Sequence, residues 1–505
     1  MLNIRTNRFS IIVLCLLSLG CGCMLSCKKF VTIPPPINQL VGTKVFNDSA
    51  TAAGVITSIY ERMSEGSYVI YGYPVITFTG ATTGSNSIAV YGGLSSDELI
   101  AYPNISSFTQ LRAYKNALNN SDLLIWGDAY QFINTANDAI EGITGAGNKI
   151  PARVRKQLIG EACFIRAFWY FYLTNFFGDV PLAVTTDYKA TASLPRAHQA
   201  AVYQQIIADL TAAKDSLNPV YVGTGGVPDL SPDERVRPNK WTAAALLARV
   251  YLFMNNYPQA EAEATSVIQQ SATYSLEPDP NNVFLNTSKE AIWQLEPVKP
   301  FSATEDGKTF FALFGPNSYN NPVTMSQSLY NAFEPNDLRF TDWVDSTIQN
   351  GITYYFPAKY KVWSFSYPTT EYLMMFRLGE QYLIRAEARA QQGNITGANS
   401  AQSDLNAIRE RAQLPDNTTD ITQGAMLAAI EKERRVELFT EWGHRWLDLK
   451  REKGFANPSI SRADEIMPAA CTAKGGTWNT TDQLYPLPLL DLQLDPALTQ
   501  NPGYN

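Results

Sequence analysis

RLGEQYLIRAEARAQQGN (residues 377–394), DLNAIRERAQLP (404–415) and IEKERRVELFTEWGHRWLDLKR (430–451) are three helix-forming stretches that follow one another closely in the chain. In the first, the small residues Ala386 and Ala390 share one helical face with Tyr382, which lets a second helix approach closely. Gly393 is followed by Asn, the two residue types that most readily adopt the left-handed cap of a helix. We expect the second helix to stop at Pro415.

The third stretch carries an apolar face surrounded by charge. Val436, Phe439 and Trp442 recur at three-residue steps, and Trp446 and Leu447 lie one turn further on. This pattern predicts a helix that runs through the whole stretch. The Glu and Arg residues around it, from Glu431 onward, are interpreted as ion pairs that fix the packing of helices, with Arg445 and Asp448 in the same network.

Residues 377–388 and 433–451 resemble two signatures of the SusD/RagB family, the surface lipoproteins of glycan-uptake systems. In that family the segments read approximately R-L-x-E-x-Y-L-I-R-A-E-A and E-R-R-x-E-L-x-x-E-G-x-R-W-x-D-L-K-R. Two departures are visible: Gly379 takes a place usually filled by a larger residue, and Trp442 adds one residue before Gly443. Residues 160–182 (GEACFIRAFWYFYLTNFFGDVPL) and the closing LYPLPLLDLQLDPALTQNPGYN also resemble the family.

The resemblance implies a mainly α-helical, tetratricopeptide-repeat-like scaffold with a loop-rich, mixed ligand-binding region. It implies a non-enzymatic protein of the outer membrane that captures oligosaccharides and delivers them to a SusC-like TonB-dependent transporter, with the helical repeats as the docking surface. RagB-like members bind peptides, so a peptide receptor is the first alternative. A surface glycosidase and a purely structural adaptor are the others.

Residues 1–26 have the features of a lipoprotein signal peptide. Arg5 and Arg8 precede an apolar run from Ile11 to Leu19, which is far shorter than the ~20 residues of a membrane-spanning helix. The sequence before Cys27 resembles a bacterial lipobox, which implies lipid attachment at Cys27; Cys21 is the competing site. An ordinary signal peptide with incidental cysteines is the alternative.

We expect residues 27–40 to form a lipid anchor and a Pro-rich spacer, and residues 41–505 to form a single body. The formal net charge is −7, and loss of the leader would remove two arginines, which argues against nucleic-acid binding. The body retains only Cys163 and Cys471, which do not make a disulfide framework.

Helical repeats are predicted over residues of about 120–272 and 372–451. Residues 241–270 resemble a tetratricopeptide repeat, with small residues such as Ala248 and Ala260 where helices would cross. The aromatic residues of 160–182 recur at helical spacing inside an apolar run, so we interpret them as core. Residues 454–505 are predicted to be irregular.

The ligand region is predicted in two loop-rich segments, about 66–115 and 274–371, which mix aromatic residues with Asn and Ser. Sugars present C–H faces that stack on aromatic rings and hydroxyls that need polar partners. The candidate ligand-binding residues are Tyr91, Tyr102, Asn104, Tyr319, Asn320 and Trp363.

No catalytic constellation is visible in the sequence. The two histidines, His198 and His444, have no nucleophile motif beside them, and no Walker loop, H-E-x-x-H or D-x-D-x-D-G loop occurs. Asp97 and Glu98 are the one suggestive pair of loop carboxylates, but adjacent residues rarely face the same point. We therefore expect no cofactor, no metal and no catalytic residue.

Overall fold

The computed structural model describes residues 45–66, 68–70, 76–78, 80–102, 107–122, 125–223, 234–299, 301–317 and 320–504. The chain divides into two units, 1–45 and 46–505. The predicted signal peptide, Cys27 and the Pro-rich spacer lie outside the described residues, and so do Asn104 and Tyr319.

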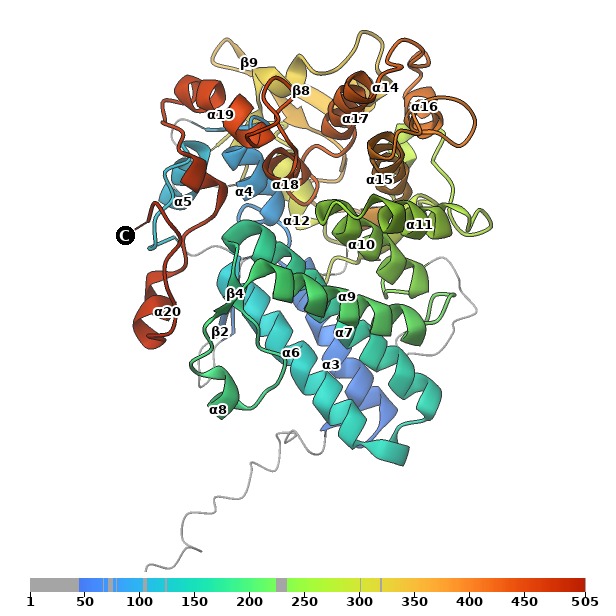
Figure 1. The fold of residues 1–505 in the computed structure, drawn as a ribbon, viewed down its shortest axis with the longest axis vertical. Coiled ribbons are helices and arrows are strands. Elements are labelled where there is room, and N and C mark those ends of the chain that lie inside the picture. Colours follow the sequence, from blue (N-terminus) through green and yellow to red (C-terminus); the bar gives the residue numbers. More distant parts are fainter. Residues whose placement is uncertain are drawn as a thin grey trace, which may run out of the picture. The chain divides into compact units, whose positions relative to one another are not determined.

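The second unit is mainly helical, which confirms the predicted fold class (Figure 1). One series of helices forms a continuous stack in which each helix packs against the next. The series consists of α3 (Ser49–Ser64), α6 (Trp126–Gly145), α7 (Ala152–Phe177), α9 (Gln199–Ser216), α10 (Lys240–Phe253), α11 (Tyr257–Ile268), α15 (Leu378–Gln391), α16 (Ala401–Arg411) and α17 (Gln423–Glu437).

Small residues allow the close approach of helices in this stack. Ala248 of α10, Ala260 of α11 and Ala388 of α15 belong to one buried cluster, as the repeat-like spacing predicts. Ala386 and Ala390 face α16 and α17 in a second cluster. Because no bulky side chain separates the backbones, these helices can lie side by side, as the repeat resemblance implies.

Helix α7 forms the centre of the core. Its aromatic side chains are buried: Phe164, Phe168, Trp169, Phe171 and Tyr172 are at most 1% exposed. The interpretation of this aromatic stripe as core, and not as a sugar platform, is therefore confirmed.

The remaining helices cover the stack or lie in its connections. They are α4 (Ile88–Ser95), α5 (Phe108–Tyr114), α8 (Tyr188–Thr191), α12 (Glu305–Phe310), α13 (Gln327–Tyr330), α14 (Leu338–Trp343), α18 (His444–Arg451), α19 (Arg462–Ala473) and α20 (Leu489–Leu494). Short 3-10 turns occur at Gly147–Lys149, Pro280–Asn282 and Thr480–Gln483.

Strands within the described residues form two-stranded antiparallel pairs. The pairs are β1 (Tyr68–Ile70) with β2 (Ile76–Phe78), β3 (Leu99–Ala101) with β7 (Val323–Met325), β4 (Val180–Pro181) with β5 (Arg196–Ala197), β6 (Ala291–Leu295) with β10 (Leu373–Arg377), and β8 (Val344–Gln349) with β9 (Ile352–Pro357). Asn350 and Gly351 both have positive φ in the two-residue turn between β8 and β9, as a tight hairpin of this kind requires.

Three sequence-based expectations about elements are wrong. Residues 80–102 are not a continuous loop, because Ser87 caps the buried helix α4. The stretch 430–451 is not one helix, because α17 ends at Glu437 and α18 begins only at His444. Residues 454–505 contain α19 and α20.

The break between α17 and α18 has a physical cause. Thr440 and Trp442 have φ of 55° and 48°, and Gly443 has φ of 67°, so the backbone leaves the right-handed helix at these three positions. The Trp442 indole N–H donates to the Met374 carbonyl at 3.0 Å, which turns the ring toward β10. Tertiary contacts thus override a helical apolar spacing.

Candidate ligand-binding surface

The predicted ligand-binding residues fall into different environments. Trp363 is 40% exposed, Asn320 is exposed, and Tyr102 is half-buried at the wall of a cavity. Tyr91 is only 3% exposed, and its hydroxyl donates to Asn86 Oδ1 at 3.2 Å within the α4 region. Of the described candidates, Trp363 lies in a group of exposed rings and Tyr102 lines a cavity.

The first feature is a group of five exposed rings that we name the aromatic face. It consists of Phe301, Phe314, Trp363, Phe365 and Tyr367. Phe314 meets Trp363 edge-on with ring centroids 5.6 Å apart. Phe301 contacts Phe365 at 5.8 Å and Tyr367 at 4.7 Å. Each ring has an edge against its neighbour, and a large part of its surface stays in contact with water.

The aromatic face is held by backbone pairing between two distant loops. Ala303 N donates to Ser364 O, and Ser366 N donates to Phe301 O, each at 2.9 Å. Phe301 has φ of 65°, an uncommon conformation for a bulky residue. Strain of this kind persists only where the surroundings enforce it, and it concentrates at functional sites.

Close packing of α12 also fixes the position of these two loops. Thr304 caps α12 by accepting from Gly307 N at 2.9 Å. A Cβ at Gly307 would lie 2.4 Å from the Val362 carbonyl, so only glycine allows α12 to approach the segment that carries Trp363.

The second feature is a cavity of about 260 Å³ that we name the tyrosine pocket. It lies between β3, β7 and β9, and its walls include Tyr102, Tyr330, Tyr354 and Tyr355. Tyr330 and Tyr355 pack at 4.5 Å between ring centroids. None of the described residues that line the pocket is charged, which suits a neutral ligand that carries hydroxyl groups.

One loop connects the two features. Pro316 lines the tyrosine pocket, and Phe314, two residues earlier, belongs to the aromatic face. The β8–β9 hairpin supports this loop, because Thr347 Oγ1 donates to Leu313 O at 3.1 Å. The pocket and the aromatic face are therefore neighbouring parts of one surface.

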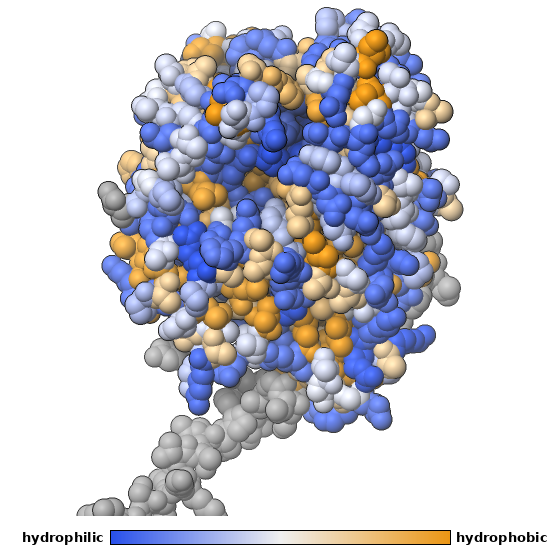
Figure 2. All heavy atoms as spheres, in the orientation of Figure 1, coloured by the Kyte–Doolittle hydropathy of each residue, from blue (hydrophilic) through white to orange (hydrophobic). Residues whose placement is uncertain are grey.

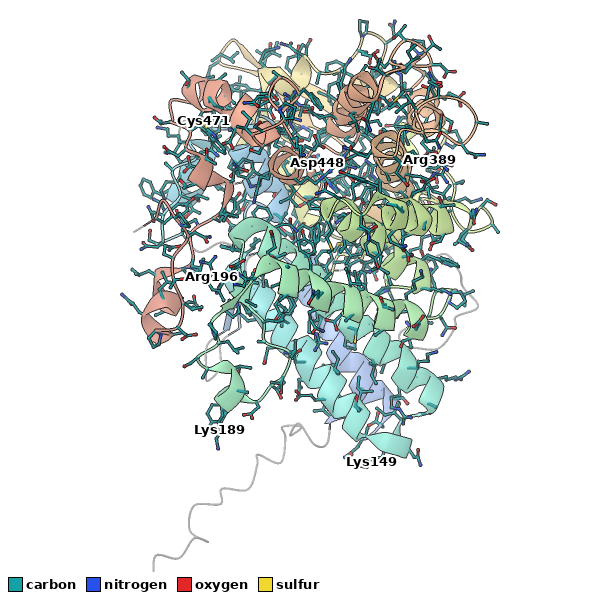
Figure 3. The ribbon with its side chains drawn as sticks, in the orientation of Figure 1. Lys149, Lys189, Arg196, Arg389, Asp448 and Cys471 are labelled. Atoms are coloured by element: carbon teal, nitrogen blue, oxygen red, sulfur yellow. The ribbon has the colours of Figure 1, made fainter. Side chains whose placement is uncertain are left out.

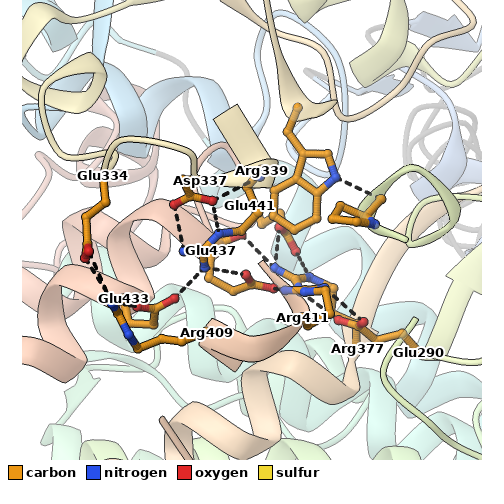
Figure 4. A network of polar contacts seen from close by, with 12 residues as sticks. Glu290, Glu334, Asp337, Arg339, Arg377, Arg409, Arg411, Glu433, Glu437 and Glu441 are labelled. Carbon is orange, nitrogen blue, oxygen red and sulfur yellow. Dashed lines mark hydrogen bonds and ion pairs between the residues drawn. The ribbon is translucent and has the colours of Figure 1, made fainter. Parts of the chain in front are cut away.

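A buried network of charges joins this loop region to the helical stack (Figure 4). Arg339 of α14 pairs with Asp337 at 2.9 Å and reaches Glu433 and Glu437 of α17 at 2.6 and 2.9 Å. Arg377, at the end of β10, pairs with Glu290 at 2.9 Å and with Glu441 at 2.7 Å. The predicted role of the charged helix in ion pairs that fix packing is confirmed.

Glu437 lies at the centre of this network. Burial alone would raise the pKa of its carboxyl, but the guanidinium groups of Arg411, Arg377 and Arg339 outweigh burial and hold the pKa well below its usual value. Glu437 therefore stays ionised in the folded chain. The segment around α14 is attached to α17 through charges that cannot be separated without a large cost.

The carboxylate pair that a glycosidase would need is part of the structural network. Asp97 is buried and forms ion pairs with Arg445 and with Arg435, each at 2.8 Å. Arg445 also pairs with Glu431 at 2.7 Å, and Arg434 pairs with Asp448 at 2.8 Å, as the sequence predicts. Glu98 is only 2% exposed. Neither carboxylate of the pair is placed to meet a glycosidic bond in solvent.

His444 and the two cysteines are also in structural settings. Burial lowers the pKa of His444 well below its usual value, with Arg249 and Arg434 nearby adding to the effect. Cys163 and Cys471 are buried free thiols. Within the described residues, no group of His, Cys, Asp and Glu side chains is arranged to hold a metal, and no helix is both long and apolar enough to cross a bilayer.

Comparison with known proteins identifies the relatives of this chain. Residues 345–504 match the SusD family, and residues 94–252 match a family described as starch-binding and associating with the outer membrane. SusD-like protein P2 of Formosa agariphila is 28% identical over 431 residues, which cover 75% of this chain and 80% of that protein.

Solved structures with the same fold cover nearly the whole chain. Surface glycan-binding protein A from Bacteroides uniformis superposes with a TM-score of 0.72 and 20% identity over 89% of this chain and 98% of that one. A laminarin-binding SusD-like protein superposes with a TM-score of 0.68 and 22% identity over 90% and 100%. Two family matches and the shared fold agree with the signatures at residues 377–388 and 433–451, and the chain belongs to the SusD/RagB family.

Proposed function

We propose that this chain is a surface glycan-binding protein associated with the outer membrane, and that it captures oligosaccharides on the aromatic face and in the tyrosine pocket. Its relatives support this proposal, because they are named as starch-binding, laminarin-binding and surface glycan-binding proteins. SusD-family glycan-binding proteins are non-catalytic, so the proposal is for binding without turnover.

The observation that carries the proposal is the aromatic face itself. Large apolar side chains at the surface of a soluble body cost free energy unless they meet a partner. Here the exposed rings come from two loops that pair through their backbones, and one of them sits on a strained residue, Phe301. A sugar ring that stacks on such a surface covers the rings and leaves its hydroxyls free for nearby polar groups.

The proposal is tested with a panel of soluble oligosaccharides and a panel of peptides, measured by isothermal titration calorimetry on the same preparation. We expect at least one neutral glycan to bind and to be recovered intact after long incubation. Binding confined to peptides would support the peptide-receptor alternative. Release of shorter sugars would support a glycosidase. Either result would contradict the proposal.

We further propose that Cys27 carries the lipid anchor, and that a SusC-like TonB-dependent transporter receives the glycan. Stacked helix pairs present extended surfaces, and we place the transporter contact on the helical stack. Purification from membranes under mild detergent tests the partner, with a Cys27→Ala variant as the test of anchoring. We expect a barrel protein to co-purify and the variant to leave the membrane fraction. Recovery of the full-length chain alone would count against the partner.

A further inference from the structure

A second cavity lies far along the chain from the ligand surface, between α6, the connection around α8 and the C-terminal residues. Its volume is about 340 Å³, within the range of small-molecule sites. Its walls include Trp126, Tyr130, Asn134, Asp491 and Asp495. Every residue that lines it is among the described residues, and none of them belongs to the aromatic face or to the tyrosine pocket. Figure 2 shows that hydrophobic residues reach the surface in the lower half of the view, where α6 and α9 lie.

One face of α6 supplies the aromatic wall. Trp126, Tyr130, Ile133, Asn134 and Asn137 recur at three- and four-residue steps, so they lie along one side of the helix. The rings of Trp126 and Tyr130 are 5.0 Å apart and tilted by 56°. The Tyr130 hydroxyl donates to the Pro181 carbonyl at 2.8 Å, which orders the ring at the cavity wall.

The opposite wall of the cavity carries two carboxylates and no basic side chain. Asp491 and Asp495 line the cavity, and no Lys, Arg or His does. The nearby guanidinium of Arg196 (Figure 3) donates instead to the Asp179, Phe177 and Thr499 carbonyls and to Asn501.

Elsewhere in the same structure, several buried carboxylates pair with arginine. Arg166 meets Asp209 at 2.6 Å, and Arg385 meets Asp404 at 2.6 Å. At Asp491, burial raises the pKa of the carboxyl, and hydrogen bonds from Trp126 and the backbone oppose the rise only in part. A positive charge in the cavity would relieve this burial cost.

We infer that this cavity is a second ligand site, and that it takes a small organic cation with a ring or an apolar face, such as an amino sugar. Tyr130, which is half-buried at the cavity wall, offers a π surface, to which cations are attracted. Asp491 and Asp495 offer acceptors for the ammonium hydrogens. The same carboxylates, with no base to offset them, repel an anion of the same size. This site is independent of the glycan surface and does not require it.

The test compares three ligands that share one ring and differ in charge. Glucosamine, glucose and glucuronate are titrated into the wild-type chain by ligand-observed NMR, together with choline as a cation without a sugar ring. We expect the two cations to bind and glucuronate to bind least. Asp491→Asn should weaken the binding of glucosamine about tenfold, the loss expected for a hydrogen bond between charged groups. Asp416→Asn, an exposed acid in the loop before α17, is the matched control.

A second variant distinguishes cation binding inside the cavity from general attraction of cations to a negatively charged protein. Ala192 is an exposed residue on the wall, and Ala192→Trp would fill the cavity without removing an acid. We expect this variant to lose cation binding while its melting temperature stays near that of the wild type. Equal binding of glucose and glucosamine, absence of cation binding to the wild type, or full binding by the Ala192→Trp variant would each overturn the inference.

Discussion

Arg339 is the residue on which the attachment of the loop region depends most directly. Its side chain is fully buried and compensates Asp337, Glu433 and Glu437. Replacement by methionine would leave the buried Asp337 without a counter-charge and would remove one of the cations that surround Glu433 and Glu437, which costs about 3–5 kcal/mol.

Urea unfolding of Arg339→Met measures this cost. Lys432→Ala is the matched control, because Lys432 is half-exposed and pairs with the partly exposed Glu334. We expect the control to change the free energy of unfolding by less than about 1 kcal/mol. Similar effects of the two variants would show that the buried network adds nothing beyond an ordinary surface ion pair.

Glu98 makes the stability of the fold depend on pH near neutrality. Burial raises the pKa of its carboxyl to about 7, while donation from Thr440 N and the charges of Lys359 and Arg435 act in the opposite direction and Asp97 adds to the rise. The unfolded chain has a pKa near 4.5 for the same group. The folded state therefore binds the proton of Glu98 more tightly than the unfolded state does. The stability that this proton contributes is complete below the pKa of the unfolded chain and is lost as the pH rises through the folded pKa of about 7.

We expect the free energy of unfolding of the wild type to fall, relative to that of Glu98→Gln, as the pH is raised from about 5 to about 8. The difference is bounded at roughly 3 kcal/mol by the size of the pKa shift. Parallel pH profiles for the two proteins would mean that Glu98 is not protonated in the fold.

Individual residues of the candidate ligand surface could be predicted only from the mixed aromatic and polar composition of the loops. Trp363 and Tyr102 come from segments that mix aromatic and polar residues; Trp363 belongs to the aromatic face and Tyr102 lines the tyrosine pocket. Tyr91 comes from a similar segment, but Ser87 begins a buried helix there. Phe365 and Tyr367 were missed, although they follow Trp363 at alternate positions, the spacing of an extended segment.

At the scale of elements, two glycines decide how α4 meets the break between α17 and α18. A Cβ at Gly92 would lie 2.7 Å from the Cα of Gly443, so Gly92→Ala would force the two backbones apart. Overpacking of this kind costs about 1–3 kcal/mol.

Gly54 is the matched control, because it also lies in a helix but has nothing within 4 Å of an added Cβ. We expect Gly54→Ala to stabilise the chain by about 0.5–1 kcal/mol, as alanine does in a helix. Thermal unfolding of both variants measures the change in stability that each substitution causes. A stabilising Gly92→Ala would show that α4 does not pack closely at Gly443.

Element prediction succeeded where the signal was local. The helical spacing of aromatic residues in α7 and the small residues of α10 and α15 were sufficient to predict these helices. It failed between α17 and α18 because the turn depends on contacts from Glu98 and Met374, which lie far away in the sequence. It also failed for α19, where the capping residue Ser461 occurs among turn-forming residues, and for α20, which begins after Pro488 without a side-chain cap.

At the scale of the whole second unit, the helical stack is distinct from the loops on which we propose that glycans bind. The helical stack buries the aromatic residues of α7, while the rings of the aromatic face stay exposed on paired loops. The buried charges of Arg339 and Arg377 connect the two regions (Figure 4). Ring substitutions on the loops should therefore alter binding without altering the fold.

The most direct test of the account is the affinity for the best glycan of the panel, measured by calorimetry on two double variants. Phe314→Ala with Trp363→Ala removes one ring pair, and Phe365→Ala with Tyr367→Ala removes the other. Tyr188→Ala is the control, because Tyr188 is 70% exposed on α8 and Tyr367 is 75% exposed.

We predict that at least one double variant loses about tenfold or more in affinity, which corresponds to about 1.4 kcal/mol, while its melting temperature stays near that of the wild type. The Tyr188→Ala control should bind within about twofold of the wild type, because no stacking surface is removed. Unchanged affinity in both double variants would contradict the claim that the aromatic face carries the glycan.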